Sequence, residues 1–267
     1  MTIQSASQTS LSPAIQAKSF NEAIESKLIA CFSQDQDEIR RAQLLRARIF
    51  NLNTGDINST EKDKNRFESS HLDKDHFDDI CLHLIVKDSL SNNIVGYSRI
   101  LTSDIISSPS EFYTASEFVI DKIIEPEKRY MEIGRTCVDP NYRSGAVIGL
   151  LWSKIGQYIN KHNIDYLMGC ASISMHDGGA TAISVVNYLR KSHFTAENMR
   201  VEPKIPLTQF DVNIEGKQYI PALLKTYLRM GAKVCGEAFV DKDFNVADVV
   251  ILLAKTDIKP RYLRHFS

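Results

Sequence analysis

The 267-residue sequence lacks an excess of charge of either sign. It has 32 Lys and Arg residues against 33 Asp and Glu residues, which gives a net charge of −1. Domains that hold nucleic acid over a broad surface are usually strongly basic. The balance argues against a general nucleic-acid-binding protein, and we expect no nucleic-acid partner. It leaves local basic patches open.

Cysteine is also scarce, and its pattern excludes several site types. The five cysteines form no C-x-x-C pair, and their number is odd. This is atypical of zinc sites and of disulfide frameworks, and it fits a reducing compartment. We expect no metal site, and we interpret the cysteines as small buried hydrophobic residues. They are Cys31, Cys81, Cys137, Cys170 and Cys235.

Long hydrophobic runs are missing as well. Segment 1–20 has no apolar core of signal-peptide length, and no stretch reaches the roughly 20 apolar residues that cross a bilayer. We expect a cytoplasmic protein, and peripheral contact with the inner face of a membrane stays open. Segment 258–267 mixes basic and aromatic residues and is the candidate for such contact.

Three widespread catalytic and nucleotide-binding patterns are absent: G-x-G-x-x-G, G-K-[ST] and G-x-S-x-G. Ser172, His176 and Asp177 lie close together in the sequence and are the residue types of a hydrolase triad. Because the nucleophile elbow is missing, a triad is disfavoured, and we interpret Asp177 as a helix cap.

The hydrophobic pattern predicts one α/β domain at 19–257, between a disordered tail at 1–18 and a basic, aromatic tail at 258–267. The long polar segment 53–79 is expected to be a functional loop. We expect a mixed sheet flanked by helices. Strands are expected at 27–33, 81–89, 93–103, 129–140, 165–173 and 246–256. Helices are expected at 36–51, within 115–124, and at 148–159, 180–191 and 221–231.

Two charges in the strand at 129–140 stand out, because an unpaired charge in a buried strand costs several kcal/mol. Glu132 and Arg135 are three residues apart, so in a flat strand they point to opposite faces. A bulge at Gly134 would place them on the same side. The alternative is a structural ion pair.

The segment after this strand predicts a short loop at a helix N-terminus. Gly145, Ser144 and Ala146 let backbone amides approach a ligand closely, and Arg143 adds a positive charge. Amides at a helix start favour an anion such as a phosphate. The alternative is a glycine that serves only the turn.

This loop resembles a degenerate acyl-carrier loop of the GNAT acyltransferases, with one residue fewer before the glycine and no second glycine. Four further segments, EIGRTCVDPNYRSGAVIGLLW, LMGCASI, PALLKTYLRMGAKVCGE and DFNVADVVILL, resemble the bacterial L-ornithine Nα-acyltransferases over about 35–255. The resemblance implies a GNAT-like fold, with a mixed, mostly antiparallel twisted sheet and a splayed central strand. It implies backbone amides of that strand as oxyanion donors.

A more distant likeness is to the acyl-homoserine lactone synthases, whose pattern of site residues recurs here in the same order. The matching residues are Arg46, Phe50, Asp75, Asp78, Arg99, Glu132 and Arg135. The likeness implies an acceptor site, with Glu132 as the base or the amine-positioning group. The arginines would bind the substrate carboxylate, and Asp75 or Asp78 a second amine. The alternative is a salt-bridge web that orders the long loop.

The resemblance implies transfer of a 3-hydroxyacyl group from acyl carrier protein to the α-amine of L-ornithine, giving lyso-ornithine lipid. The donor would be the phosphopantetheine arm, or acyl-CoA, with no permanently bound cofactor. Basic residues on the expected helix at 221–231 and near it are candidates to dock an acidic carrier. The alternative is that they form an ordinary solvated helix face. They are Lys225, Arg229, Lys233, Arg143 and Lys154.

Two rival functions stay open at this point. One is an N-acyltransferase for another amino acid or amine, including one that makes a signal molecule. The other is a non-catalytic protein that binds an acyl carrier or lipid. The presence of both Glu132 and Arg135 argues against lost catalysis.

Overall fold

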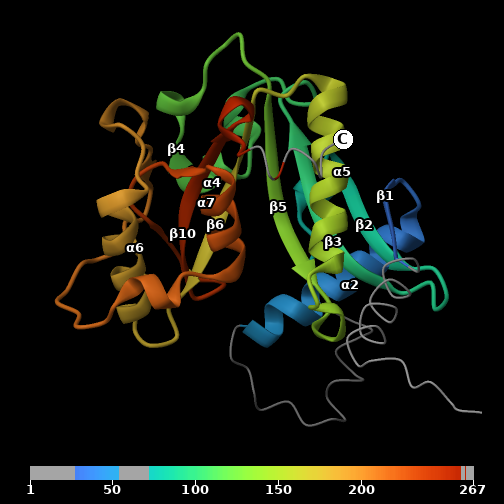
Figure 1. Cartoon of the computed structure of the whole chain (residues 1–267), viewed down its shortest axis with the longest axis horizontal. Coiled ribbons are helices and arrows are strands. Elements are labelled where there is room, and N and C mark those ends of the chain that lie inside the picture. The colour runs from blue at the N-terminus through green and yellow to red at the C-terminus, as the bar shows by residue number, and fades with distance from the viewer. Residues whose placement is uncertain (1–27, 54–71, 260–261, 263–267) are drawn as a thin grey trace, which may run out of the picture.

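A computed structural model describes residues 28–53, 72–259 and 262, and it arranges them around one eight-stranded sheet. The strand order is β1-β2-β3-β5-β6-β10-β8, with β9 also pairing with β10 (Figure 1). The predicted tail 1–18, most of the polar segment 53–79 and most of the tail 258–267 lie outside the described residues.

The expected strands are all present, and short strands too brief to give a sequence pattern join them. The main sheet contains β1 Leu28–Ser33, β2 Leu82–Asp88, β3 Ile94–Thr102, β5 Tyr130–Val138, β6 Tyr166–Ser174, β8 Lys233–Val234, β9 Phe239–Asp241 and β10 Val246–Ala254. A second small sheet pairs β4 Phe118–Val119 with β7 Glu202–Pro203. The pair β5–β6 is parallel, and the other strand pairs of the main sheet are antiparallel.

The helices follow the predicted periodicity except in the segment 114–124. The α-helices are α2 Gln36–Asn53, α4 Thr114–Glu117, α5 Ala146–His162, α6 Ala180–Ser192 and α7 Ala222–Met230. The helix expected within 115–124 is the short α4, because the chain turns at Phe118 into β4. Pro221 and Gly231 flank α7, as expected from proline's fixed φ and glycine's tolerance of positive φ.

The two faces of the sheet are covered differently. α5 and α7 lie over one face of the sheet (Figure 1), and together with α6 they bury apolar side chains of β5, β6 and β10 in the largest core cluster. On the other face, α2 packs over β2, β3 and β5, and the segment around α4 packs over β5, β6 and β10. On this second face, Phe50 of α2 and Tyr113 beside α4 line the cavity described below.

β5 and β6 separate partway along their length. Their parallel ladder ends at the pair Glu132–Met168, although β6 stays paired with β10 as far as Ser174. This is the splayed central strand that the resemblance implies. Gly169, the next residue of β6, lets the strands come close where they diverge, since a Cβ there would lie 2.4 Å from the Ile133 carbonyl oxygen.

The predicted bulge in β5 is confirmed, although it was expected at Gly134 and lies at the next residues. Arg135 and Thr136 together lie opposite Ser98 of β3, which is the two-against-one pattern of a bulge. Arg135, at φ 51°, is the residue in the left-handed region, whereas Gly134 is not. The extra residue places the side chains of Glu132 and Arg135 against the same cavity.

We expect Gly169→Ala to lower the free energy of unfolding by about 1 to 3 kcal/mol, because the methyl group would force the backbones of β5 and β6 apart. Gly134→Ala is the matched control, because its Cβ would meet nothing within 4 Å. Urea unfolding of both variants tests this. Equal effects of the two variants would show that the close approach at Gly169 is unimportant.

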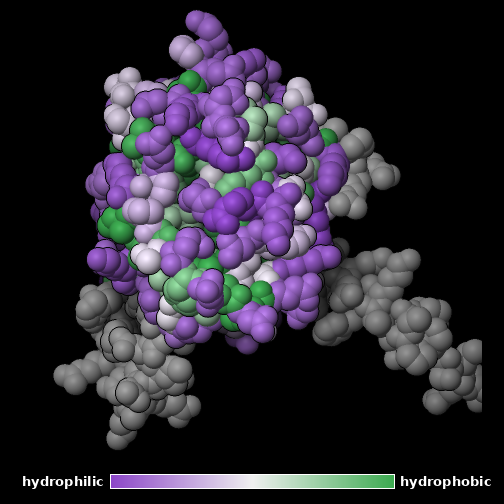
Figure 2. All heavy atoms as spheres, turned by 90° about the vertical axis from the view of Figure 1, so that its left-hand side faces the viewer, coloured by the Kyte–Doolittle hydropathy of each residue, from purple (hydrophilic) through white to green (hydrophobic). Residues whose placement is uncertain are grey.

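None of the described helices is long and apolar enough to cross a bilayer. Hydrophilic side chains cover most of the face that includes α6, and hydrophobic residues lie among them in small groups (Figure 2).

Candidate active site

Glu132 is buried at the point where β5 leaves β6, and its carboxylate is held by the segment that starts α4. Oε2 accepts a hydrogen bond from the Tyr113 amide at 2.8 Å. Oε1 accepts from the Thr114 amide at 2.7 Å and from the Thr114 hydroxyl at 2.5 Å. Burial raises the pKa of Glu132, and these hydrogen bonds oppose the rise.

Glu132 and Arg135 do not form the structural ion pair that was the alternative. Arg135 instead lies 3.4 Å from Asp73 and 3.4 Å from Asp75. Its guanidinium carbon also lies 5.3 Å from the ring centre of Tyr113, and similar contacts reach Phe244 and Phe50. Carboxylates and aromatic rings thus hold the side chain of Arg135, the residue whose backbone is left-handed.

The remaining predicted arginines and aspartates form a salt-bridge web. Arg46 is fully buried, and its guanidinium bonds Asp78 and, at 3.1 Å, Asp73. Arg99 bonds Asp75 at 2.5 Å and Asp78 at 3.2 Å. Burial alone would raise the pKa of Asp78, but the bonds from Arg46 overcome it and lower the pKa to about 2.

The structure therefore brings all seven residues of the predicted pattern into one region. Phe50, Arg99, Glu132 and Arg135 line a shared cavity, whereas Arg46, Asp75 and Asp78 do not line it. Asp73 is the member of the web that sequence reasoning missed. Because the three aspartates are matched by three arginines, the web is close to electrically neutral.

The cavity, of about 240 Å³, is lined from both faces of the sheet. Leu224 and Tyr227 of α7 reach it from the face that carries α5, and Tyr113 reaches it from the face that carries α2. Ile133 and Ala171 line it between the two strands. The cavity therefore passes through the sheet where β5 and β6 separate.

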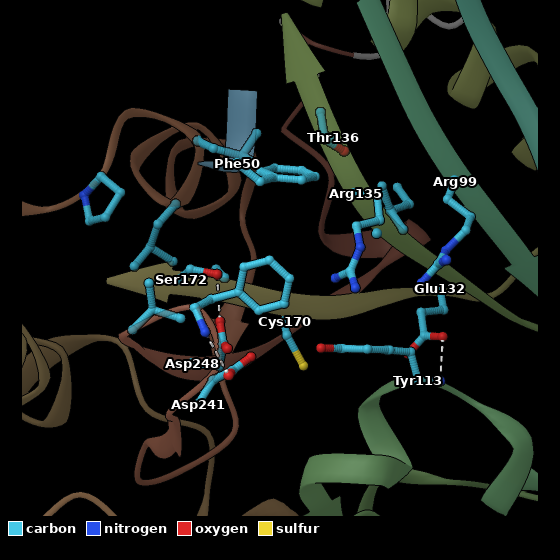
Figure 3. Close-up of a pocket in the computed structure, with 18 of the residues that line it drawn as sticks. Phe50, Arg99, Tyr113, Glu132, Arg135, Thr136, Cys170, Ser172, Asp241 and Asp248 are labelled. Atoms are coloured by element: carbon cyan, nitrogen blue, oxygen red, sulfur yellow. Dashed lines mark hydrogen bonds between the residues drawn. The ribbon is translucent and has the colours of Figure 1, made fainter. Parts of the chain in front are cut away.

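A second group of carboxylates, which sequence reasoning missed, reaches this cavity through Asp241 and Asp248. Glu117, Asp241 and Asp248 each offer an oxygen within 4.8 Å of the others. Figure 3 shows Asp241 and Asp248 on the opposite side of the pocket from Glu132. Burial raises the pKa of Glu117 to about 7 and that of Asp248 to about 6; repulsion by Asp248 and Asp241 adds to the first rise, and repulsion by Asp241 adds to the second.

The sequence does contain a signal for Asp248. It is the single charge in the strand sequence VADVVILLA, and it faces the same side of β10 as Val250 and Leu252. The argument that singled out Glu132, a charge in an otherwise apolar strand, applies here as well. Asp241 and Glu117 give no such signal, since they lie in short elements.

The hydrolase triad is absent. The Ser172 hydroxyl donates to Asp248 at 2.6 Å, and His176 lies 3.1 Å from the Asn245 side chain. Asp177 accepts hydrogen bonds from the Thr181 amide and hydroxyl in the first turn of α6, so its interpretation as a helix cap is confirmed.

The candidate carrier loop leads directly into α5. Arg143 and Ser144 are exposed, Gly145 adopts φ 99°, and Ala146 begins the helix. Gly145, the N-cap residue, has no side chain that could accept a hydrogen bond from the amides of the first turn. The loop thus presents backbone amides at the start of a 17-residue helix.

The basic residues proposed to dock a carrier are partly in place. Arg143, Arg229 and Lys233 are exposed, and Lys154 and Lys225 are half-buried. Lys233 lies in β8 rather than on the helix, because α7 ends at Met230 before Gly231. Their role in docking stays a prediction.

Comparison with known proteins places these features in a family context. Residues 45–153 match the family model described as "Acetyltransferase (GNAT) domain". The chain is 32% identical over 254 residues to an L-ornithine N(alpha)-acyltransferase of Agrobacterium fabrum, covering 88% of this chain and 83% of that protein. It is 35% identical over 209 residues to a protein of the same name from Rhizobium meliloti, covering 73% and 71%.

A solved structure of an N-acyl amino acid synthase from uncultured soil microbes also superposes on the chain. The TM-score is 0.49 at 11% sequence identity, and the match covers 86% of this chain and 92% of the other.

Proposed function

Because the chain belongs to the L-ornithine N(alpha)-acyltransferase family and is an acyltransferase of the GNAT fold, we propose that it acylates the α-amine of L-ornithine. The acyl group is a 3-hydroxyacyl chain carried on the phosphopantetheine arm of acyl carrier protein. The product is lyso-ornithine lipid, which leaves toward the cytoplasmic face of a membrane.

The observation that carries the proposal is a buried carboxylate at a cavity that crosses the sheet. Glu132 faces the cavity where β5 and β6 separate. The N-terminus of α5 belongs to one face of the sheet, and the arginine–aspartate web belongs to the other. This arrangement supports entry of the acyl donor from the α5 face and of the amino acid from the opposite face.

The reaction is aminolysis of a thioester. The α-amine nitrogen attacks the acyl carbonyl carbon, the carbon–sulfur bond breaks, and the phosphopantetheine thiolate leaves and takes up a proton. The attacking amine must be neutral and must lose a proton, and Glu132, with its raised pKa, accepts it directly or through water. Peptide groups of β5 beyond the pair Glu132–Met168 are released from β6 and are suited to bind the oxyanion.

The substrate carboxylate requires a cation, and Arg135 is suited to bind it. It lines the cavity together with Glu132, and its contacts with Asp73 and Asp75 are long, at 3.4 Å. Arg99 also lines the cavity but is more tightly held, at 2.5 Å from Asp75. Arg46 does not line the cavity and is assigned to the structural web.

A direct assay tests the proposal. The purified protein is incubated with 3-hydroxyacyl carrier protein and a panel of amino acids and amines, and N-acyl products are detected by mass spectrometry. Product with ornithine supports the proposal. Product only with another acceptor supports the rival N-acyltransferase, and carrier binding without any product supports the non-catalytic rival. Parallel assays with 3-hydroxyacyl-CoA identify the donor.

The carrier loop leads to a further prediction. Arg143→Glu is expected to raise KM for the acyl carrier roughly tenfold with little change in kcat, because it replaces an attractive charge by a repulsive one at the docking surface. Lys191→Glu makes the same charge change on exposed α6 and is the control. Equal KM values for the two variants would argue against docking at Arg143.

A further inference from the structure

The proposed acceptor has two amines, and the residues that were expected to hold the second one are already neutralised. Asp75 and Asp78 both bond Arg99, and Asp78 also bonds Arg46. An ammonium group gains little binding energy from carboxylates whose charge is already neutralised by guanidinium groups. If ornithine is the acceptor, its side-chain ammonium needs another acidic partner in the cavity.

We propose that Glu117, Asp241 and Asp248 bind the side-chain ammonium group of the acceptor and thereby select a basic amino acid. The inference rests on the proposed function, since it assigns a subsite within the same cavity. It names the class of acceptor by its chemistry: an α-amino acid whose side chain ends in a primary ammonium group.

Three separate elements bring this cluster together. Asp248 of β10 lies directly opposite Ser172 of β6 in the antiparallel ladder. Asp241 of β9 lies opposite Val246, two residues before Asp248 on the same strand. Glu117, at the end of α4, completes the group from the segment that covers this face.

Within the part of the chain that the structure describes, no lysine or arginine forms a salt bridge with the cluster. Glu117 is only 4% exposed. Its Oε2 atom is buried without a hydrogen-bond partner among the described residues. The hydrogen-bond partners of the cluster are neutral groups: the Tyr113 and Ser172 hydroxyls, the Cys170 thiol, and the Asp243 and Phe244 amides that donate to Asp241. The charge of Arg135 lowers the pKa of Asp248, but it is the weakest of the influences on that pKa.

The cluster lies close to the proposed reaction centre. Tyr113 joins the two directly, since its amide donates to Glu132 and its hydroxyl bonds Glu117. Cys170 does the same from β6: its thiol lies 3.8 Å from the Thr114 hydroxyl, and Glu117, Asp248 and Glu132 all contribute to raising its pKa after burial. One small diamino acid is therefore able to place its α-amine at Glu132 and its side chain at the cluster.

An ammonium group matches the cluster in charge and in hydrogen bonding. It carries three N–H donors, and the cluster offers three carboxylates from three directions. A divalent cation is the other occupant that carboxylates of this spacing suit, and the experiment below distinguishes the two. The position of Asp241 and Asp248 on the same cavity as Glu132 favours a group of the substrate.

The pH dependence of acceptor binding offers a second way to detect an ammonium group at the cluster. Burial and repulsion by neighbouring carboxylates favour protonation of Glu117 and Asp248, while the Tyr113, Cys170 and Ser172 hydrogen bonds and the Arg135 charge favour their ionisation. Ionisation of Glu117 and Asp248 proceeds as pH rises through about 6 to 7. Affinity for a cationic side chain should rise over the same range, whereas affinity for an apolar side chain should not.

The test compares L-ornithine with L-norleucine, which has a methyl group in place of the side-chain ammonium. We expect the wild-type enzyme to prefer ornithine in kcat/KM, and Asp248→Asn to reduce that preference roughly 10- to 100-fold, mainly through KM for ornithine. Glu117→Gln is the second variant, and Asp243→Asn, an exposed carboxylate two residues from Asp241, is the control. The ornithine preference of the wild type should increase between about pH 5.5 and 8.

Several outcomes would overturn the inference. These are equal use of norleucine and ornithine by the wild type, an unchanged preference in both cluster variants, or a preference abolished by a chelator and restored by Mg²⁺ or Mn²⁺. Calorimetric binding of ornithine and norleucine without an acyl donor keeps the two proposals separable. If no acceptor is acylated but ornithine binds more tightly than norleucine and Asp248→Asn removes the difference, the proposed function fails and the subsite stands.

Discussion

Glu132→Gln is expected to lower kcat roughly 10²- to 10⁴-fold while the affinity for the acyl carrier changes little, because the variant cannot accept the proton of the attacking amine. Glu132 lines the cavity at the end of the β5–β6 ladder, and burial raises its pKa toward the range of a useful base. Single-turnover rates and carrier binding, measured separately, give the two quantities.

A control must separate proton transfer from anchoring, because Glu132 also holds Tyr113 and Thr114. Thr114→Val removes one hydroxyl donor from Glu132 and leaves both backbone bonds and the carboxylate in place. We expect this variant to lose less than about tenfold in kcat. If it loses as much as Glu132→Gln, the role of Glu132 is positioning. If Glu132→Gln keeps wild-type turnover, Glu132 is not the base.

Asp78→Asn is expected to lower the free energy of unfolding by about 3 to 5 kcal/mol at neutral pH. The side chain of Asp78 is 1% exposed and bonds two arginines that are themselves buried, Arg46 and Arg99. Removal of the charge leaves both guanidinium groups desolvated and only partly paired. Urea unfolding monitored by circular dichroism measures the change, and the midpoint should move with little change in slope.

The neighbouring residue provides the matched control. Asp79 has a side chain 68% exposed and lies 3.3 Å from Lys74, so Asp79→Asn should change stability by less than about 0.5 kcal/mol. The pH dependence gives a second check. The pKa of Asp78 is lowered on folding, so its contribution is complete above the unfolded value and is lost as pH falls through about 2. Equal effects of the two variants would mean that the web contributes little.

Sequence reasoning located the strand charges of the site because an apolar strand makes a charge conspicuous. Glu132 and Arg135 stood out in this way, and the order of Arg46, Asp75 and Arg99 matched a related pattern. The structure brings these residues together. The expected bulge followed from one physical requirement, that two side chains three residues apart should share a side.

Other parts of the site were beyond sequence reasoning for physical reasons. Tyr113 and Thr114 bind Glu132 mainly through backbone amides, which every residue type but proline offers. Asp241 and Glu117 join Asp248 through contacts distant in sequence, and each lies in an element too short to have a period. Arg135 was not expected at positive φ, because that conformation is uncommon outside glycine and asparagine.

The passage of the cavity through the sheet has a consequence for the order of events. A single-mouthed pocket would force the long acyl donor and the small acceptor to share one entrance, so one would trap the other. Here Leu224 and Tyr227 line one side and Tyr113 the other. Under the proposed function, with the carrier docked on the α5 face, the acceptor is free to exchange while the carrier stays docked, and a wrong amino acid can leave without loss of the acyl chain. The proposed function then predicts several trials of the acceptor for each carrier that docks.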